Sequence, residues 1–192
     1  FRIKHLGIAR RASNGIELRV HPTLIPAEQL IANVNGVKNA VLVQAHAVGP
    51  TLYYGAGAGA GPTASAVVAD VIDIVRDISY TEDGAGTIPQ LAFEALTNMP
   101  ILSREEMTTG YYIRLNAEDQ TGVLADVTTI LSRAGISIDA IMQQSRLKDL
   151  IPIVILTDPI VESKMDEALA QIQALPAIRG EIVRIRLESL DS

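Results

Sequence analysis

The feature that most constrains this chain is a run of alternating glycine and alanine, Gly55 to Gly61, between a short apolar stretch and a helical pattern. Glycine has no Cβ, so its backbone takes positive φ and lets another molecule approach the main chain closely. Pro62 is preset for a first helical turn. Apolar residues then recur at helical spacing, namely Val67, Val68, Val71, Ile72, Val75 and Ile78. The sequence therefore predicts a strand, a glycine loop and a helix with one buried face.

The glycine loop allows two interpretations. Gly55, Gly57 and Ala60 fit the loose dinucleotide pattern G-x-G-x-x-G/A, and the N-terminus of a helix can bind an anion. A Rossmann unit needs a second parallel strand after the helix, whereas a polar stretch follows Ile78, so we reject that version. The alternative is that glycine and alanine only permit close packing of helix on sheet. Spacing alone does not decide between a functional surface and tight packing.

Length and composition bound the class of protein. The 192 residues suffice for one or two domains, and 48% hydrophobic with 20% charged residues is ordinary for a soluble globular protein. The chain begins at Phe1 within a basic, apolar segment, so we expect a piece of a longer protein. The absence of cysteine excludes a disulfide framework and a zinc–thiolate site, and it is typical of a cytoplasmic protein.

The charge pattern argues against nucleic acid and membrane partners. The net charge is −6, and residues 81–192 carry nine Lys and Arg against seventeen Asp and Glu, which disfavours nucleic acid. The uncharged residues 39–69 include glycines and prolines, which argues against a helix that crosses a bilayer. The histidines His5, His21 and His46 show no metal-ligand spacing. We therefore expect structural roles for them and no metal site.

The first 80 residues read as strands joined by turns. Ser13-Asn14-Gly15 is a turn signal, and the run after it alternates, with Glu17 and Arg19 on the face opposite Ile16, Leu18 and Val20. Further along, the pattern predicts an extended segment from His21 to Pro26, a short helix from Pro26 to Ala32, a turn at Asn35-Gly36, and strands from Val37 to Ala45 and Leu52 to Tyr54. Together they predict a mostly antiparallel sheet with covering helices.

From Tyr111 onward, strands and helices are predicted in the order βαββαβ, a ferredoxin-like arrangement. The strands run from Tyr111 to Leu115, Ile136 to Arg146, Ile151 to Thr157 and Ile182 to Leu187, and the helices from Thr121 to Ala134 and from Ser163 to Pro176. Asp166 follows Ser163 as in a capping box, and Arg184 and Arg186 are expected to point outward. The fold class is therefore α+β. An RNA-recognition domain is disfavoured because its central strands would carry stacking aromatics.

Three segments within the first 80 residues occur in an order that resembles one enzyme family. They are ELRVHPTLIP, NVNGVKNAV and YYGAGAGAGPTASAVVADV, and they resemble the C-terminal part of the catalytic region of homoserine dehydrogenase. The resemblance implies a dimer interface and one wall of an active site, with Gly59 matching the family's contact to the cofactor NAD(P). The family's nucleotide-binding fold and catalytic lysine lie upstream of Phe1. We therefore expect no catalytic residue in this chain and no activity from it alone.

A second resemblance lies in the other half of the chain. The stretch from Asp119 to Leu124 resembles the first turn of an ACT domain, the small amino-acid-sensing module. In this arrangement Gly122 lets a ligand approach, and the N–H groups of Gly122, Val123 and Leu124 point at its carboxylate. Asp119 is equally suited to capping the helix and to contacting the ammonium group of the ligand.

Two further positions complete the predicted effector site. Asn116 is a candidate side-chain contact. Residues 137–143 resemble the second strand of the ACT domains of aspartate kinases, in which the position that matches Gln143 touches the effector.

Together the resemblances predict three segments: residues 1–80 from the substrate and dimerisation region, a linker at 81–109, and an ACT regulatory domain at 110–192. The expected full-length protein interconverts L-homoserine and L-aspartate 4-semialdehyde with NAD(P), forms a homodimer or homotetramer, and takes threonine as its feedback effector. Residues 79–110 would carry the effect of threonine to the helix after the glycine loop. The alternative is a non-catalytic assembly module whose ACT domain binds no ligand.

Overall fold

The computed structural model describes residues 1–81, 97–143 and 150–190. The strands are β1 (Arg2–Ala12), β2 (Gly15–Ile25), β3 (Lys38–Ala45), β4 (Gly49–Ala56), β5 (Thr108–Glu118), β6 (Ile138–Gln143), β7 (Leu150–Val161) and β8 (Ile178–Leu187). The helices are α1 (Ala60–Thr81), α2 (Val123–Arg133) and α3 (Glu162–Gln173), with short 3-10 helices η1 (Leu30–Asn33) and η3 (Arg104–Glu106). The chain divides into two compact units, one of residues 1–32 and 99–192 and the other of residues 33–98.

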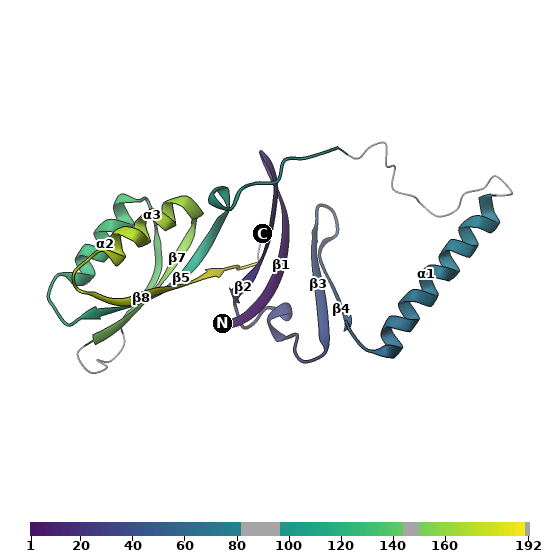
Figure 1. The fold of residues 1–192 in the computed structure, drawn as a ribbon, viewed down its shortest axis with the longest axis horizontal. Coiled ribbons are helices and arrows are strands. Elements are labelled where there is room, and N and C mark those ends of the chain that lie inside the picture. The colour runs from purple at the N-terminus through teal and green to yellow at the C-terminus, as the bar shows by residue number, and fades with distance from the viewer. Residues whose placement is uncertain (82–96, 144–149, 191–192) are drawn as a thin grey trace. The chain divides into compact units, whose positions relative to one another are not determined.

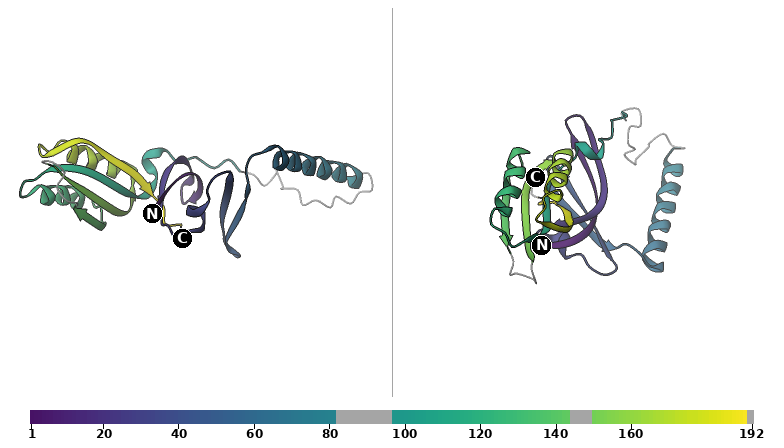
Figure 2. Two further views of the ribbon diagram at one scale, coloured as in Figure 1. Left: turned by 90° about the horizontal axis from the view of Figure 1, so that it is seen from below. Right: turned by 60° about the vertical axis from the view of Figure 1, so that its left-hand side comes forward.

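The first unit is built on one six-stranded sheet with the strand order β1-β2-β8-β5-β7-β6 (Figure 1). Along the chain, the elements from β5 onward follow the order β5-α2-β6-β7-α3-β8. Helices α2 and α3 cover the same face of this sheet (Figure 2). The predicted βαββαβ arrangement and the α+β class are therefore confirmed.

The hairpin of β1 and β2 extends this sheet. The two strands pair antiparallel along their whole length, from Arg2 opposite Ile25 to Ala12 opposite Gly15. Strand β2 then runs parallel to β8, with Thr23 opposite Arg186. Residues from the two ends of the chain thus share one sheet, which local sequence patterns do not predict.

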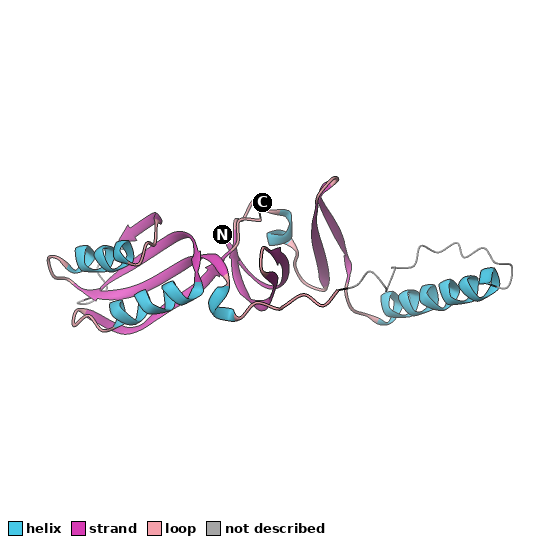
Figure 3. Cartoon of the chain, turned by 90° about the horizontal axis from the view of Figure 1, so that it is seen from above, coloured by secondary structure: helices cyan, strands magenta, loops and turns pink. Residues whose placement is uncertain are grey.

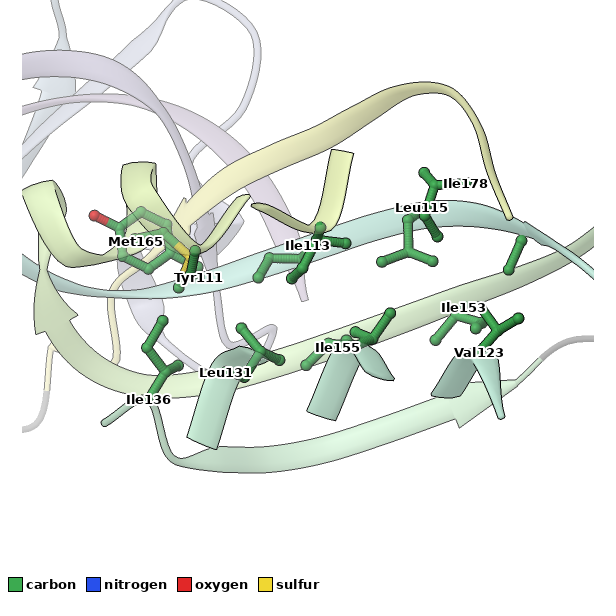
Figure 4. Packing of buried hydrophobic residues seen from close by; sticks show 14 residues of the cluster. Tyr111, Ile113, Leu115, Val123, Leu131, Ile136, Ile153, Ile155, Met165 and Ile178 are labelled. Atoms are coloured by element: carbon green, nitrogen blue, oxygen red, sulfur yellow. The ribbon is translucent and has the colours of Figure 1, made fainter. Parts of the chain in front are cut away.

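The core of the first unit lies between the sheet and its two helices. Helix α2 contributes Val123, Val127 and Leu131, which recur every four residues and therefore form one face of the helix. The other buried apolar residues shown in Figure 4 come from the strands, from α3 and from the adjoining loops, and include Tyr111, Ile113, Leu115, Ile136, Ile153, Ile155, Met165 and Ile178. Each fully buried large aliphatic side chain contributes about 1.5–3 kcal/mol to folding.

Strand β2 buries its polar face. The predicted alternation in β2 is confirmed, but Glu17 and Arg19 are only 4% and 7% exposed, whereas Leu18 and Val20 are 45% and 70% exposed. His21 follows on the buried side of the strand. This strand therefore presents ionic groups to the interior of the unit and an apolar surface to solvent.

The second unit contains the β3–β4 hairpin and helix α1 (Figure 3). The predicted Asn35-Gly36 turn is confirmed: Gly36 has a φ of +64°, and the Lys38 N–H donates to the Asn35 carbonyl oxygen at 3.4 Å. Helix α1 begins just before Pro62, as predicted. Its predicted apolar face is 45–59% exposed rather than buried, because no described part of this unit covers it.

Some predicted boundaries and one predicted cap are wrong. Helix α3 begins at Glu162 after an N-cap at Val161 that makes no side-chain hydrogen bond, so Ser163 does not cap it and there is no capping box with Asp166. The short helix expected near Pro26 is the 3-10 turn η1. The end of the predicted strand from Ile136 to Arg146 lies outside the described residues.

Within the described chain, no helix combines the length and hydropathy required to span a bilayer.

The segments predicted at 1–80, 81–109 and 110–192 refer to family domains and stay a prediction. The compact units group the chain differently, because the β1–β2 hairpin belongs with the sheet of β5 to β8.

Candidate functional site

The start of helix α2 has the geometry that an anion-binding turn requires. Gly122 is the N-cap residue, with a φ of +96° and a ψ of −20°, a conformation that favours glycine. The Asp126 N–H donates to the Gly122 carbonyl oxygen at 2.9 Å, which closes the first turn. The N–H groups of Val123 and Leu124 precede that bond and have no acceptor within the helix. They are therefore available to a carboxylate at the positive end of the helix dipole.

Gln143 lies at the same end of the sheet as this turn. It ends β6 opposite Ile153 on β7, and Ile153 belongs to the core face that the helices cover. Figure 4 places Val123 at the same end of the core as Ile153 and Leu115. The structure thus brings Gln143 and the first turn of α2 to one end of the helix-covered face.

Asn116 and Asp119 are placed differently. Asn116 stands on β5 between the core residues Leu115 and Ala117, so by strand alternation it lies on the face of the sheet away from the helices. Asp119 lies in the connection from β5 to α2, upstream of the N-cap at Gly122 rather than at it.

Two glycines of the glycine loop are constrained in different ways. Gly59 has a φ of +122°, and a Cβ there would meet Pro62 only at an ordinary 3.5 Å, so backbone conformation and not space selects glycine. At Gly57, in contrast, a Cβ would overlap the exposed side chain of Asn39 on β3, which would have to move aside. Gly59 precedes α1 and accepts the Thr63 N–H at 3.1 Å. Its main chain can therefore be approached by another molecule.

A buried carboxylate lies at the other end of the ACT core. Glu162 begins α3 and is fully buried, and it accepts from the Tyr111 hydroxyl at 2.6 Å and from Arg186 Nε at 2.8 Å. Arg184 Nη2 is 3.3 Å from the same carboxylate, and Arg184 also pairs with Asp166 on the next turn of α3. The prediction that Arg184 and Arg186 point outward is therefore wrong. Both lie on the same face of β8 as Ile182, which packs against the core, so they face α3 and its buried carboxylate.

These contacts shift the pKa values of the cluster. Burial alone would raise the pKa of Glu162, but hydrogen bonds from Arg186 and Tyr111 and the charges of Arg186 and Arg184 outweigh it, so this pKa is lowered. Burial and the bond to Glu162 raise the pKa of Tyr111, which keeps its hydroxyl protonated. At neutral pH the cluster therefore holds an ionised Glu162 and an uncharged Tyr111.

A second ionic cluster ties the hairpin to the ACT sheet. The Glu188 carboxylate accepts from Arg10 Nη2 at 2.8 Å, from Arg19 Nη2, and from the Thr109 hydroxyl at 3.1 Å. Glu17 pairs with Arg19 at 2.9 Å. Since Glu17, Arg19 and Glu188 are all buried, these pairs fix the position of β2 against β5 and the end of β8.

Sequence reasoning missed both clusters, although one signal was available. Glu162 stands at helical spacing before Met165, Leu169 and Ile172, the apolar face of α3, and is therefore on the buried side of that helix. A carboxylate there needs cationic partners, and Arg184 and Arg186 alternate correctly to supply them from one strand.

Two family models match the chain. Residues 1–72 match the model described as homoserine dehydrogenase, and residues 111–175 match the model described as ACT domain. The first match covers the β1–β2 and β3–β4 hairpins and the start of α1. The second covers β5 through α3.

Relatives that match the chain over nearly its whole length are named homoserine dehydrogenase. The chain is 52% identical to a homoserine dehydrogenase of Pseudomonas aeruginosa and 49% identical to one of Neisseria gonorrhoeae, over 100% and 99% of its length. The crystal structure of a homoserine dehydrogenase from Thiobacillus denitrificans matches 98% of the chain with 56% identity and a TM-score of 0.88.

The chain spans less than half of each of these proteins: 44% of both relatives and 43% of the solved structure. Structures of the Staphylococcus aureus enzyme match at 20% identity with a TM-score of about 0.60, which bears on the fold alone. Two adjoining family matches and relatives near 50% identity agree with one another. The chain therefore belongs to the homoserine dehydrogenase family and carries an ACT domain.

Proposed function

We propose that the chain is part of an NAD(P)-dependent homoserine dehydrogenase, which interconverts L-homoserine and L-aspartate 4-semialdehyde in threonine and methionine biosynthesis. The homoserine dehydrogenase match over residues 1–72 carries this proposal. In it, Gly59 contacts the cofactor, because a glycine with a φ of +122° carries no Cβ that would keep another molecule away from its main chain. The cofactor supplies hydride transfer when bound. This chain supplies one wall of the site and no catalytic residue, so it is inactive alone.

The ACT domain in this proposal is the sensor of a small amino acid, with threonine as the effector. The available N–H groups at the start of α2 suit the carboxylate of an amino acid, and Gln143 stands at the same end of the sheet. Asp119 and Asn116 remain proposed contacts. The full-length protein would be a cytoplasmic homo-oligomer.

The effect of threonine has a direct route to the hairpin. Strand β2 pairs with β8 at Thr23 and Leu24, and Glu188 holds Arg19 of the hairpin by a buried ion pair. A shift of β8 would therefore move β2 directly. The effect of threonine would not need to pass through the connection between α1 and β5. Residues 82–96 of the predicted route lie outside the described chain.

The test of the sensor is isothermal titration of the chain with L-threonine, with isoleucine, methionine and lysine in the same buffer. Saturable binding of threonine alone is expected. Equal heats for all four amino acids, or none for threonine, would contradict the assignment.

The variant that tests the position of the site is Gly122→Val. Its side chain would cover the N–H groups of the first turn, so we expect threonine affinity to fall at least tenfold. Because valine is also strained at a φ of +96°, Gly135→Val at the other end of α2 is the matched control, with a φ of +71° and open space around a Cβ. Threonine affinity should be unchanged in Gly135→Val. An equal loss of affinity in both variants would mean that strain, not the site, is responsible.

One observation favours the alternative of an assembly module. The edge strand β6 exposes Ile141 and Met142 at 40% and 52%, a surface that suits association of ACT domains. Since a ligand specific for the native state raises its stability, equal melting temperatures with and without the four amino acids would support this alternative.

A further inference from the structure

Strands β2 and β8 separate at a proline. They pair at Thr23 with Arg186 and at Leu24 with Leu187. Pro22 comes just before this pairing and has no N–H to continue the ladder. A half-open pocket of about 220 Å³ lies at this point, lined by His21, Pro22, Arg184, Ile185 and Arg186. The sequence of β2 itself thus creates the space.

The imidazole of His21 contains a buried acceptor that makes no hydrogen bond with any residue the structure describes. Its Nδ1 lies 3.1 Å from the Pro22 carbonyl oxygen, which can only accept, so Nδ1 carries the proton. The Thr23 hydroxyl, 3.0 Å from Nδ1, donates to the His21 carbonyl and so accepts from this same N–H. Among the described residues, the buried Nε2 makes no hydrogen bond. Burial lowers the pKa of His21, so Nε2 stays an unprotonated acceptor.

Arg184 and Arg186, which line the pocket, each have an N–H donor without an acceptor among the described residues. Arg186 gives Nε and Nη2 to Glu162, and Arg184 gives Nη1 to Asp166 and Nη2 to Glu162. Within the described chain, this leaves Arg186 Nη1 and Arg184 Nε without an acceptor. Arg104 also contacts both carboxylates, so three guanidinium groups face two carboxylates and one positive charge is left over.

We propose that the pocket between β2 and β8 binds a small carboxylate that also carries a hydroxyl or ammonium group. The ligand's carboxylate accepts from Arg184 and Arg186, and its hydroxyl or ammonium group donates to His21 Nε2. The left-over positive charge matches one carboxylate, and the unpartnered acceptor requires a donor next to it. This site is separate from the start of α2.

A ligand in this pocket would join two parts of the chain. His21 lies in the segment that matches homoserine dehydrogenase, and Arg184 and Arg186 lie on the strand that closes the ACT sheet. By bridging β2 and β8, the ligand would stabilise their short pairing and slow amide exchange in both strands.

The test is a comparison of glycolate, glycine and acetate, titrated into the chain at constant ionic strength and followed by thermal unfolding. Glycolate carries a hydroxyl, glycine an ammonium group and acetate neither. We expect saturable stabilisation, with glycolate or glycine bound roughly tenfold more tightly than acetate, about the effect of one hydrogen bond. Equal affinity for all three, or no saturable effect, would overturn the proposal.

Two variants with matched controls locate the site. His21→Asn keeps an atom near the position of Nδ1 and removes Nε2, so the preference over acetate should vanish, whereas His5→Asn on the other face of the hairpin should retain it. Arg184→Lys removes the free Nε and should weaken binding of all three ligands at least tenfold. Arg114→Lys, on the opposite face of the sheet, should not.

The outcomes distinguish this site from the proposed threonine site. Retention of the preference in His21→Asn would overturn the inference, whatever threonine does. If Arg184→Lys does not fold, the comparison of His21→Asn with His5→Asn decides alone. Gly122→Val, which tests the threonine site, should leave the preference for glycolate or glycine over acetate unchanged, because Gly122 does not line the pocket.

Discussion

Replacement of the buried carboxylate in Glu162→Gln perturbs the most connected polar group of the ACT core. The native carboxylate is fully buried and accepts from Tyr111 at 2.6 Å and from Arg186 at 2.8 Å, with Arg184 Nη2 at 3.3 Å. Glutamine has nearly the same shape but no charge, and its amide nitrogen cannot accept a hydrogen bond. One of the donors that Glu162 now satisfies would therefore face another donor.

The expected loss follows from the burial of the partners. Removal of one member of a buried ion pair costs about 3–5 kcal/mol, because the other charge is left uncompensated. Here the side chains of Arg184 and Arg186 keep 22% and 19% exposure, and Asp166 still pairs with Arg184. We therefore expect the lower end of that range, a decrease of about 3 kcal/mol in the free energy of unfolding.

Urea denaturation at pH 7, followed by far-UV circular dichroism, measures this decrease in the free energy of unfolding. The relevant transition is that of the first unit, which contains the ACT sheet. Glu167→Gln is the matched control, since Glu167 is exposed on the same helix and its replacement should change stability by less than about 0.5 kcal/mol. The slope of the transition with urea should be the same in all three proteins.

The difference in stability between the native chain and Glu162→Gln should also depend on pH, which a change of packing alone would not cause. The folded-state pKa of Glu162 is lowered, so its stabilising contribution is complete above the ordinary carboxyl pKa and is lost as the pH falls through the folded value. The difference between the native chain and Glu162→Gln should therefore be largest at neutral pH and shrink in acid. Asp166 titrates in both proteins and leaves this difference largely unaffected.

Two results would refute the reasoning. A loss below about 1 kcal/mol at pH 7 would mean that the arginines find solvent or Asp166 at little cost. A difference that stays constant from neutral pH into acid would mean that the charge of Glu162 contributes nothing.

Two further predictions concern packing. Gly15→Ala should destabilise the first unit by about 1–3 kcal/mol in urea denaturation, because its Cβ would overlap the Pro100 carbonyl oxygen, whereas Gly7→Ala meets its nearest atom at 3.9 Å and should be tolerated. A loss that is equal in the two variants would contradict this. Ile155→Ala removes a fully buried side chain and should cost about 2–5 kcal/mol, against less than about 0.5 kcal/mol for Val20→Ala at 70% exposure. Similar melting temperatures for these two variants would show that the core assignment is wrong.

Local patterns in the sequence were sufficient for most elements of the ACT domain. The spacing of Val123, Val127 and Leu131 selects a helix, and the alternation of Tyr111, Ile113 and Leu115 selects a strand, because both periods arise from backbone geometry within a few residues. The resemblance of residues 1–80 to homoserine dehydrogenase could also be recognised from short contiguous segments of the sequence. Both rest on residues that are neighbours in the chain, and both agree with the family matches.

The candidate effector site was predictable only in part. Gly122 was identified from its place before an apolar helix, and its φ of +96° agrees with that reading. Its relation to Gln143 and Asn116 depends on which face of the sheet each strand residue occupies, and strand pairing sets that. The predicted roles of these residues stay predictions.

Tertiary structure alone decided which faces are buried. In β2 the alternation of Leu18 and Val20 with Glu17 and Arg19 marks two faces but does not say which is inside. The answer depends on Glu188, which lies far along the chain and accepts from Arg19. In the same way, sequence determined that Arg184 and Arg186 share one face of a strand, and only the fold placed Glu162 and His21 beside that face. The physical reason is that burial and ion pairing depend on partners distant in sequence, whereas periodicity does not.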